Sequence, residues 1–71
     1  MTATDPGRDG ADLSSVASQL AELTRRVTAH ADAYRAAGDT GIAEDLYAAE
    51  RSLLGAQRTL ARARDVLSDR I

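Results

Sequence analysis

Few side chains in this sequence of 71 residues suit catalysis or metal binding. The first candidate is His30, the sole histidine. It falls on an apolar stripe with helical spacing, where a histidine usually packs its ring and turns its polar end outward. A sharper interpretation is a pH-sensitive pair of His30 and Glu50, which two antiparallel helices would bring within reach. Metal sites in helical bundles place a Glu three residues before such a histidine, but position 27 is Val. We therefore predict no metal site.

The tripeptide Asp39-Thr40-Gly41 spells the motif of aspartic proteases, in which two aspartates from a dimer share one proton. That site belongs to a β-rich fold, and this composition is short of the Val, Ile and Phe that strands favour. We interpret the tripeptide as a turn. The sequence offers no nucleophile–base pair, no phosphate-binding glycine loop and no cysteine. We therefore predict that the protein is not an enzyme and holds no cofactor.

Arginine supplies all nine basic residues, and Arg51, Arg58 and Arg62 form a candidate basic face. Such a face could contact an acidic partner or a phosphate backbone. However, acids early and arginines late in a helix are also what the helix dipole favours. No aromatic residues interleave with the arginines, and the net charge is −2. A solvated face is the favoured interpretation, and nucleic-acid binding is the alternative.

Two long segments with helical periodicity carry all of these residues. In the first, apolar positions recur in alternating steps of three and four, a pattern that a strand would scatter over both faces. They are Leu13, Val16, Leu20, Leu23, Val27, His30 and Tyr34. In the second, a leucine recurs every seventh residue, and three of these leucines are followed by an alanine three positions later. These leucines are Leu46, Leu53, Leu60 and Leu67. The eleven residues predict a seam between two helices, at about 11–37 and 41–70.

The turn between these helices is predicted at 38–40. Gly38 suits the left-handed residue that closes a helix, and Asp39 or Thr40 can cap the next one. So short a connection makes the helices antiparallel neighbours, pairing residues whose numbers add up to about 80. Residues 1–10 lack periodicity and are predicted to be a disordered tail. The predicted fold is an all-α antiparallel helical hairpin with coiled-coil-like heptad packing.

The predicted core is thin, because alanine supplies about half of the apolar residues and Phe and Trp are absent. A lone hairpin of this size comes out near zero stability, so we expect a homodimer that forms a four-helix bundle. The candidate association surface on the second helix has two alternative parts. One is a flank with Tyr47 and Leu54, and the other is a stripe of small residues that would let helices approach closely, namely Ala48, Ser52, Gly55 and Thr59. A similar small-residue stripe on the first helix consists of Ala17, Ala21, Thr24, Thr28 and Ala31.

Two family resemblances are partial. Four residues of the turn region have the spacing of one tetratricopeptide repeat, which this region therefore resembles, namely Tyr34, Gly38, Ala43 and Tyr47. However, Glu50 and Gly55 replace the Ala and Pro of that repeat. Glu50 and Asp65 also resemble the ends of the motif by which helical-hairpin anti-sigma factors bind cyclic di-GMP. Three residues between them depart from that motif, so nucleotide binding is not carried over. The departing residues are Leu54, Gln57 and Ala61.

The function class that best fits these features is a non-enzymatic helical interaction or regulatory module. It would self-associate and bind an unidentified partner protein through helix–helix contacts. The alternatives are a nucleic-acid-associated protein that uses the arginines near the C-terminus and a purely structural subunit of a larger complex. No small-molecule substrate is evident. The sequence shows no signal peptide and no apolar run that could span a membrane, so we expect a cytoplasmic protein.

Overall fold

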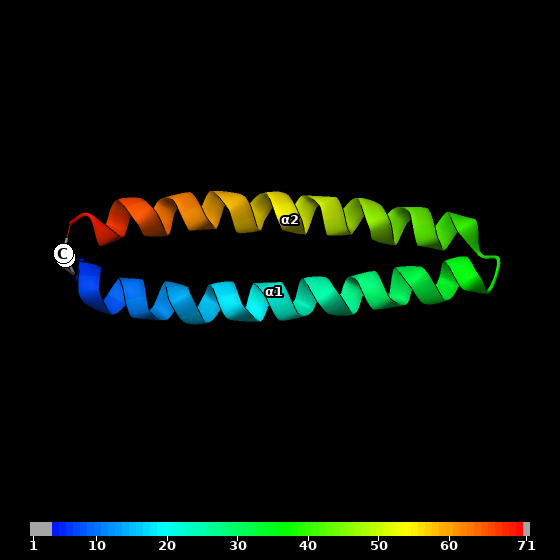
Figure 1. The fold of residues 1–71 in the computed structure, drawn as a ribbon, viewed down its shortest axis with the longest axis horizontal. Helices are drawn as coiled ribbons and strands as arrows, with labels where there is room; N and C mark the ends of the chain where they lie inside the picture. The colour runs from blue at the N-terminus through cyan, green and yellow to red at the C-terminus, as the bar shows by residue number, and fades with distance from the viewer. Residues whose placement is uncertain (1–3, 71) are drawn as a thin grey trace.

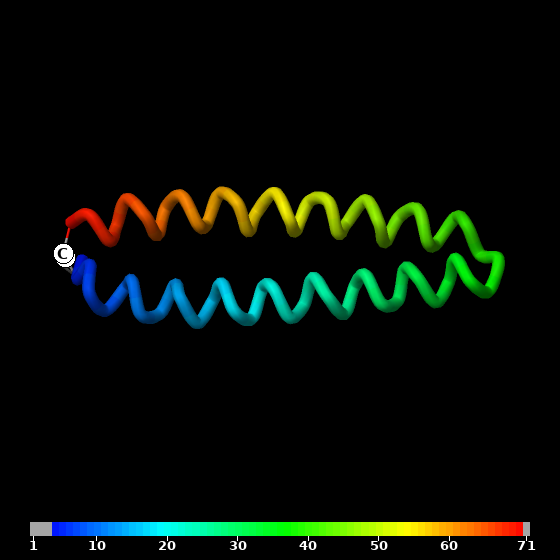
Figure 2. Tube along the Cα trace, in the orientation of Figure 1, coloured from blue at the N-terminus to red at the C-terminus, as the bar shows by residue number. Residues whose placement is uncertain are grey.

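The computed structural model describes residues 4–70 as two long α-helices joined by a tight turn (Figure 1). Helix α1 spans Pro6–Ala36 and helix α2 spans Thr40–Ser68. The two run antiparallel, side by side over their whole length, in a rod that measures 51 × 22 × 15 Å (Figure 2). The predicted all-α helical hairpin is therefore confirmed.

Helix α1 begins earlier than the sequence predicts. The side chain of Asp5 caps it by accepting a hydrogen bond from the Arg8 amide at 3.3 Å, and Pro6 occupies its first turn. Proline fits in the first turn because a backbone N–H at that position would have no helical partner anyway. The predicted tail is thus helical over 6–10, and residues 1–3 lie outside the described residues. The cap at Asp5 and Pro6 outweighs the low helix propensity of Gly7 and Gly10.

The turn is built as the sequence predicts. Gly38 adopts a left-handed backbone with φ +85°, and the Asp39 amide donates to the Tyr34 carbonyl at 2.9 Å. This hydrogen bond closes α1 in the way typical of a glycine-terminated helix. The side chain of Asp39 then caps α2 by accepting from the Ile42 amide at 3.3 Å. Asp39 therefore serves as a helix cap at the junction of the two helices.

Four side-chain hydrogen bonds cross from one helix to the other, and they fix the register. Each joins residues whose numbers add up to about 80, as predicted for a hairpin centred on this turn. The pairs are Ser14–Arg64, Thr24–Gln57, Thr28–Glu50 and Asp32–Tyr47.

The rotation of the helices differs from the predicted seam. The residues at the centre of the contact are Thr24, Ala31 and Ala43, each of which exposes at most 5% of its surface. Small side chains let the two axes approach closely, and the longer seam side chains then flank the contact on one side. Seven seam residues are half-buried, namely Leu13, Leu20, Val27, Leu46, Leu53, Leu60 and Leu67. Four are exposed, namely Val16, Leu23, His30 and Tyr34.

The small-residue stripe of the first helix therefore has a different place from the one predicted. We expected it to contact another molecule, whereas its members Thr24 and Ala31 are buried against α2. The physical reason is size, because a central row of small residues allows closer packing than a central row of leucines. The contact between α1 and α2 therefore uses this stripe, and the larger apolar side chains lie beside the contact.

Candidate functional site

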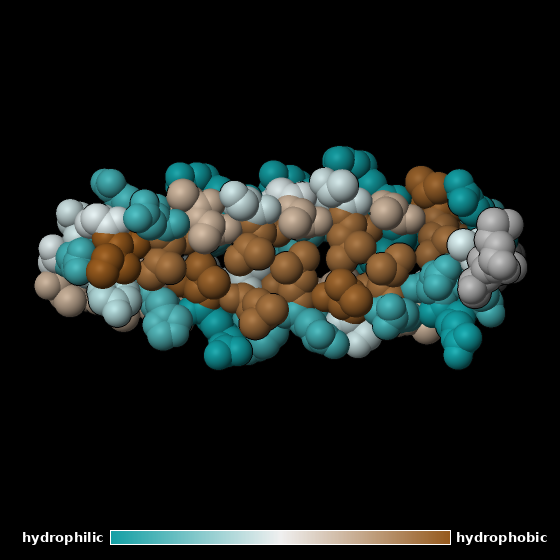
Figure 3. Space-filling view, turned by 180° about the vertical axis from the view of Figure 1, so that it is seen from behind, coloured by the Kyte–Doolittle hydropathy of each residue, from teal (hydrophilic) through white to brown (hydrophobic). Residues whose placement is uncertain are grey.

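One long side of the hairpin gathers its large apolar side chains, and we call this side the leucine face. Figure 3 shows it as an apolar surface that runs along the rod. Both helices contribute, since Leu13 and Leu67 line one hollow on it, and Leu23 and Leu53 line another. Its large residues are Leu13, Val16, Leu20, Leu23, Val27, Tyr34, Ile42, Leu46, Leu53, Leu60 and Leu67.

The leucine face is open to solvent. Leu23 exposes 49% of its surface, and Val16 and Ile42 are exposed as well. The seam prediction does not include Ile42, although it stands four residues before Leu46 and so continues the same side of α2. Large contiguous apolar surface on a small protein marks a site of association. This face is therefore the strongest candidate functional site.

Charged groups border the leucine face at two places. Asp9 and Asp12 line the hollow near the open end of the hairpin, and Arg26 and His30 line the hollow near its middle. His30 thus lies beside a cation at the edge of the leucine face. The pair predicted for it is not formed, because no hydrogen bond or ion pair joins His30 to Glu50 among the described residues. Glu50 instead accepts a hydrogen bond from Thr28.

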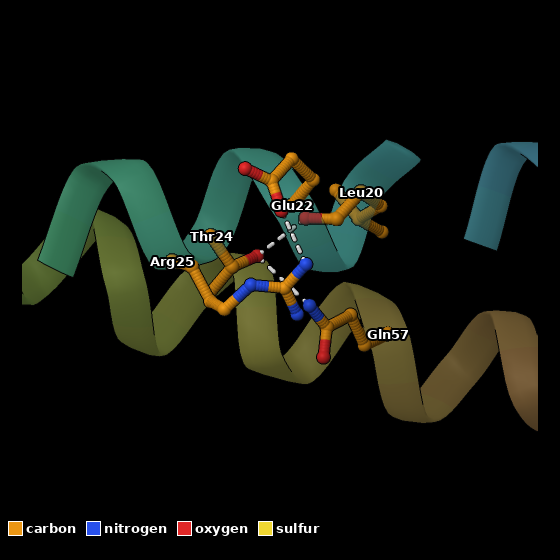
Figure 4. Close-up of polar contacts among 5 residues, drawn as sticks. All are labelled: Leu20, Glu22, Thr24, Arg25 and Gln57. Atoms are coloured by element: carbon orange, nitrogen blue, oxygen red, sulfur yellow. Dashed lines mark hydrogen bonds and ion pairs between the residues drawn. The ribbon is translucent and has the colours of Figure 1, made fainter. Parts of the chain in front are cut away.

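The opposite side of the interhelical line is polar, and we call it the polar face. At its middle the Thr24 hydroxyl donates to the Leu20 carbonyl at 2.7 Å and accepts from the Gln57 side-chain amide at 2.8 Å. Figure 4 shows this contact beside the ion pair of Arg25 and Glu22 on α1. Because Thr24 is buried, the Gln57 amide supplies a partner that water cannot easily replace.

The same face continues toward the turn through Tyr47. Its hydroxyl donates a hydrogen bond to the Asp32 carboxylate, and this bond raises the pKa of Tyr47, since ionisation would break it and bring two negative charges together. The guanidinium of Arg35 lies 5.6 Å from the centre of the Tyr47 ring and 3.8 Å from the Asp32 carboxylate. Tyr47 is therefore held against α1 through its hydroxyl, which contacts Asp32, and through its ring, which contacts Arg35.

Most of the predicted association surface lies on the outer side of α2, whereas its member Tyr47 packs against α1. Leu54 is exposed there, and so are Ala48, Ser52 and Thr59. A Cβ placed on Gly55 would meet only the Arg58 side chain, at 3.6 Å, so the hairpin itself gives this glycine no close helix neighbour.

The predicted basic face occupies the same outer side of α2. Arg51, Arg58 and Arg62 are exposed, and none of the three forms an ion pair with a carboxylate within residues 4–70. Arg62 contacts the Thr59 hydroxyl at 3.4 Å instead. The structure therefore brings the basic face and the association surface together.

Over residues 4–70 no three His, Asp or Glu side chains gather as possible metal ligands. Within the same residues, neither helix contains a stretch long and apolar enough to cross a membrane. Comparisons with protein-family models, with curated proteins and with solved structures each give no match to this chain. The leucine face and the outer side of α2 are therefore the features from which a function can be inferred.

Proposed function

We propose that this protein is a non-enzymatic helical interaction or regulatory module that works as a homodimer. Two hairpins would pack their leucine faces together as a four-helix bundle. The observation that carries the proposal is the exposure of Leu23, at 49%, beside the buried Thr24 on the same helix. The leucine face holds most of the large apolar side chains of the chain, and a single hairpin leaves it partly uncovered.

A second copy of the chain is the occupant that this face fits best. It offers an apolar face of the same length and composition, and a two-fold axis makes such a contact self-complementary. Within the hairpin, no large side chain among the described residues is fully buried. Each large apolar side chain contributes about 1.5–3 kcal/mol when fully buried, so covering this face supplies stability that one hairpin lacks.

Solution mass tests the homodimer directly. Light scattering on a sizing column is expected to give a mass near twice that of the 7.5 kDa chain. The melting temperature is expected to rise with protein concentration, because dissociation accompanies unfolding. A folded monomer whose melting temperature does not change with concentration would contradict the homodimer.

In this proposal the homodimer binds a partner protein in the cytoplasm through helix–helix contacts. The outer sides of both hairpins stay accessible, since only the leucine faces are covered. This leaves Leu54 and the three arginines of the basic face available to a partner.

A second candidate function is association with nucleic acid, which Arg51, Arg58 and Arg62 favour because they form no ion pair within residues 4–70. Fluorescence anisotropy with a labelled DNA duplex, at about 50 and 200 mM salt, separates the two functions. We expect no measurable binding under either condition. Binding that falls steeply between the two salt concentrations would favour the nucleic-acid function over a partner protein.

A further inference from the structure

One side of α2, beginning beside the polar face at Tyr47, carries a line of five residues that the leucine-face contact leaves free. They follow one another in steps of three or four, so they lie along one side of the helix. At 1.5 Å per residue the line is about 22 Å long, which matches four turns of a second helix. We call it the arginine stripe, and it consists of Tyr47, Arg51, Leu54, Arg58 and Arg62.

We infer, building on the homodimer proposed above, that the arginine stripe docks an acidic amphipathic helix of the partner protein. Glutamate or aspartate side chains of that helix would pair with Arg51, Arg58 and Arg62. Its apolar side would lie on Leu54 and the ring of Tyr47. Amphipathic partner helices are recognised through apolar anchors at every third or fourth residue, and the three arginines stand beside such anchors here.

Charge complementarity points to an acidic partner. Arg25 and Arg35 of α1 form ion pairs with Glu22 and Asp32, three positions earlier on the same helix. The three arginines of the stripe form none within the described residues, although all three are exposed. Their guanidinium groups can therefore pair with carboxylates of a partner in a bidentate geometry, and Arg62 has only a 3.4 Å contact with the Thr59 hydroxyl to give up.

The apolar members of the stripe favour a protein over a nucleic acid. Leu54 lies between Arg51 and Arg58 and exposes 39% of its surface. A phosphate backbone would gain no favourable contact with this apolar side chain. The Tyr47 ring is fixed by Asp32 and Arg35, so it cannot easily swing out to stack on a base. An ordered tyrosine flanked by arginines is typical of protein–protein contacts.

The test titrates the 71-residue chain into a fluorescent 16-residue peptide that is designed as an amphipathic helix. One peptide carries leucine at every third or fourth position with glutamate between, and the control peptide carries lysine in place of each glutamate. We expect the acidic peptide to bind and the basic peptide not to bind. The triple variant R51Q/R58Q/R62Q is expected to weaken binding of the acidic peptide at least about tenfold.

A matched triple variant, R8Q/R25Q/R70Q, removes the same charge away from the stripe and is expected to bind like the unchanged protein. Leu54→Ser is expected to weaken the acidic peptide while keeping all nine arginines. Equal effects of the two triple variants, no effect of Leu54→Ser, or no binding of the acidic peptide would each overturn the inference.

The mass of every sample is measured in the same buffer, so that the inference and the homodimer fail separately. A dimer that does not bind the acidic peptide overturns the docking site and leaves the homodimer standing. A monomer that binds it through the stripe supports the docking site and overturns the homodimer. Stronger binding of a DNA duplex, lost in R51Q/R58Q/R62Q, would assign the stripe to nucleic acid and overturn the acidic helix.

Discussion

The leucine face and the polar face lie on opposite sides of the same line of contact between α1 and α2, yet they hold the helices together differently. On the polar face, four hydrogen bonds join named partners across the helices, including Thr24 to Gln57 and Tyr47 to Asp32. On the leucine face, larger side chains meet without fixed partners, and Leu23 stays half exposed. The polar face therefore specifies the register of the two helices, and the leucine face provides the apolar surface.

This division has a physical reason. Hydrogen bonds depend on distance and angle, so each crossing pair is lost if one helix slides along the other. Apolar contact is non-directional, and a leucine gains about as much from a second hairpin as from its own neighbour. The polar face can thus set the hairpin while the leucine face remains free to join another copy.

The largest expected effect breaks the leucine face alone. Leu23→Asp places a carboxylate where the proposed dimer would bury it, and the loss of its hydration disfavours association even with Arg26 beside it. In a single hairpin the same side chain stays in water, because Leu23 is half exposed there. We expect sedimentation equilibrium to show a monomer at concentrations where the unchanged protein is a dimer.

Leu54→Asp is the matched control, since Leu54 is also exposed but lies on the outer side of α2. It is expected to keep the dimer. If Leu54→Asp dissociates the protein and Leu23→Asp does not, the second copy docks on the association surface that the sequence first indicated, around Tyr47 and Leu54.

The second effect tests what packs at the centre between the helices. Ala31 is fully buried, so Ala31→Leu must push α1 and α2 apart or force strained side chains. Overpacking of this kind costs about 1–3 kcal/mol of the free energy of unfolding. Urea denaturation at one protein concentration measures it, with Ala33→Leu, at an exposed position of α1, as the control. Equal stability of the two variants would place the leucine seam, not Ala31, at the centre of the contact.

The helices, the turn and the register could be predicted because each depends on local signals. Alternating apolar steps indicate the helices, and Gly38 followed by Asp39 indicates where one ends and the next begins. A short turn between helices of similar length then leaves little freedom of register. Sequence distance alone was enough for these features.

The rotation about each helix axis could not be predicted in this way. A heptad repeat gives two neighbouring stripes, and which of them faces the partner depends on side-chain size and on contacts across the helices. Thr24 and Gln57 lie in the central stripe because they satisfy each other, a pairing that no pattern within one helix reveals. The same rotation separates His30 from Glu50, and Glu50 accepts a hydrogen bond from Thr28 instead.

A third effect sharpens the role of the polar face. Thr24→Val keeps the shape of the side chain but leaves the half-buried Gln57 amide without its partner, at a cost of about 1–2 kcal/mol. Gln57→Leu in the same chain removes the orphaned amide, so the double variant is expected to recover much of this loss. Urea denaturation of both single variants and the double variant gives the coupling between the residues. Purely additive losses would show that the hydrogen bond does not contribute to stability.

The smallest effect concerns Gly55, in the middle of α2. A mid-helix glycine costs about 0.5–1 kcal/mol relative to alanine, and a Cβ at this position would meet only the flexible Arg58 side chain at an ordinary distance. Gly55→Ala is therefore expected to raise the free energy of unfolding by about that amount and to leave the solution mass unchanged. Thermal melts at two protein concentrations measure both stability and association. If Gly55→Ala instead destabilises the protein, and does so more at higher protein concentration, another helix packs closely on Gly55. The dimer contact would then lie on the outer side of α2 and not on the leucine face.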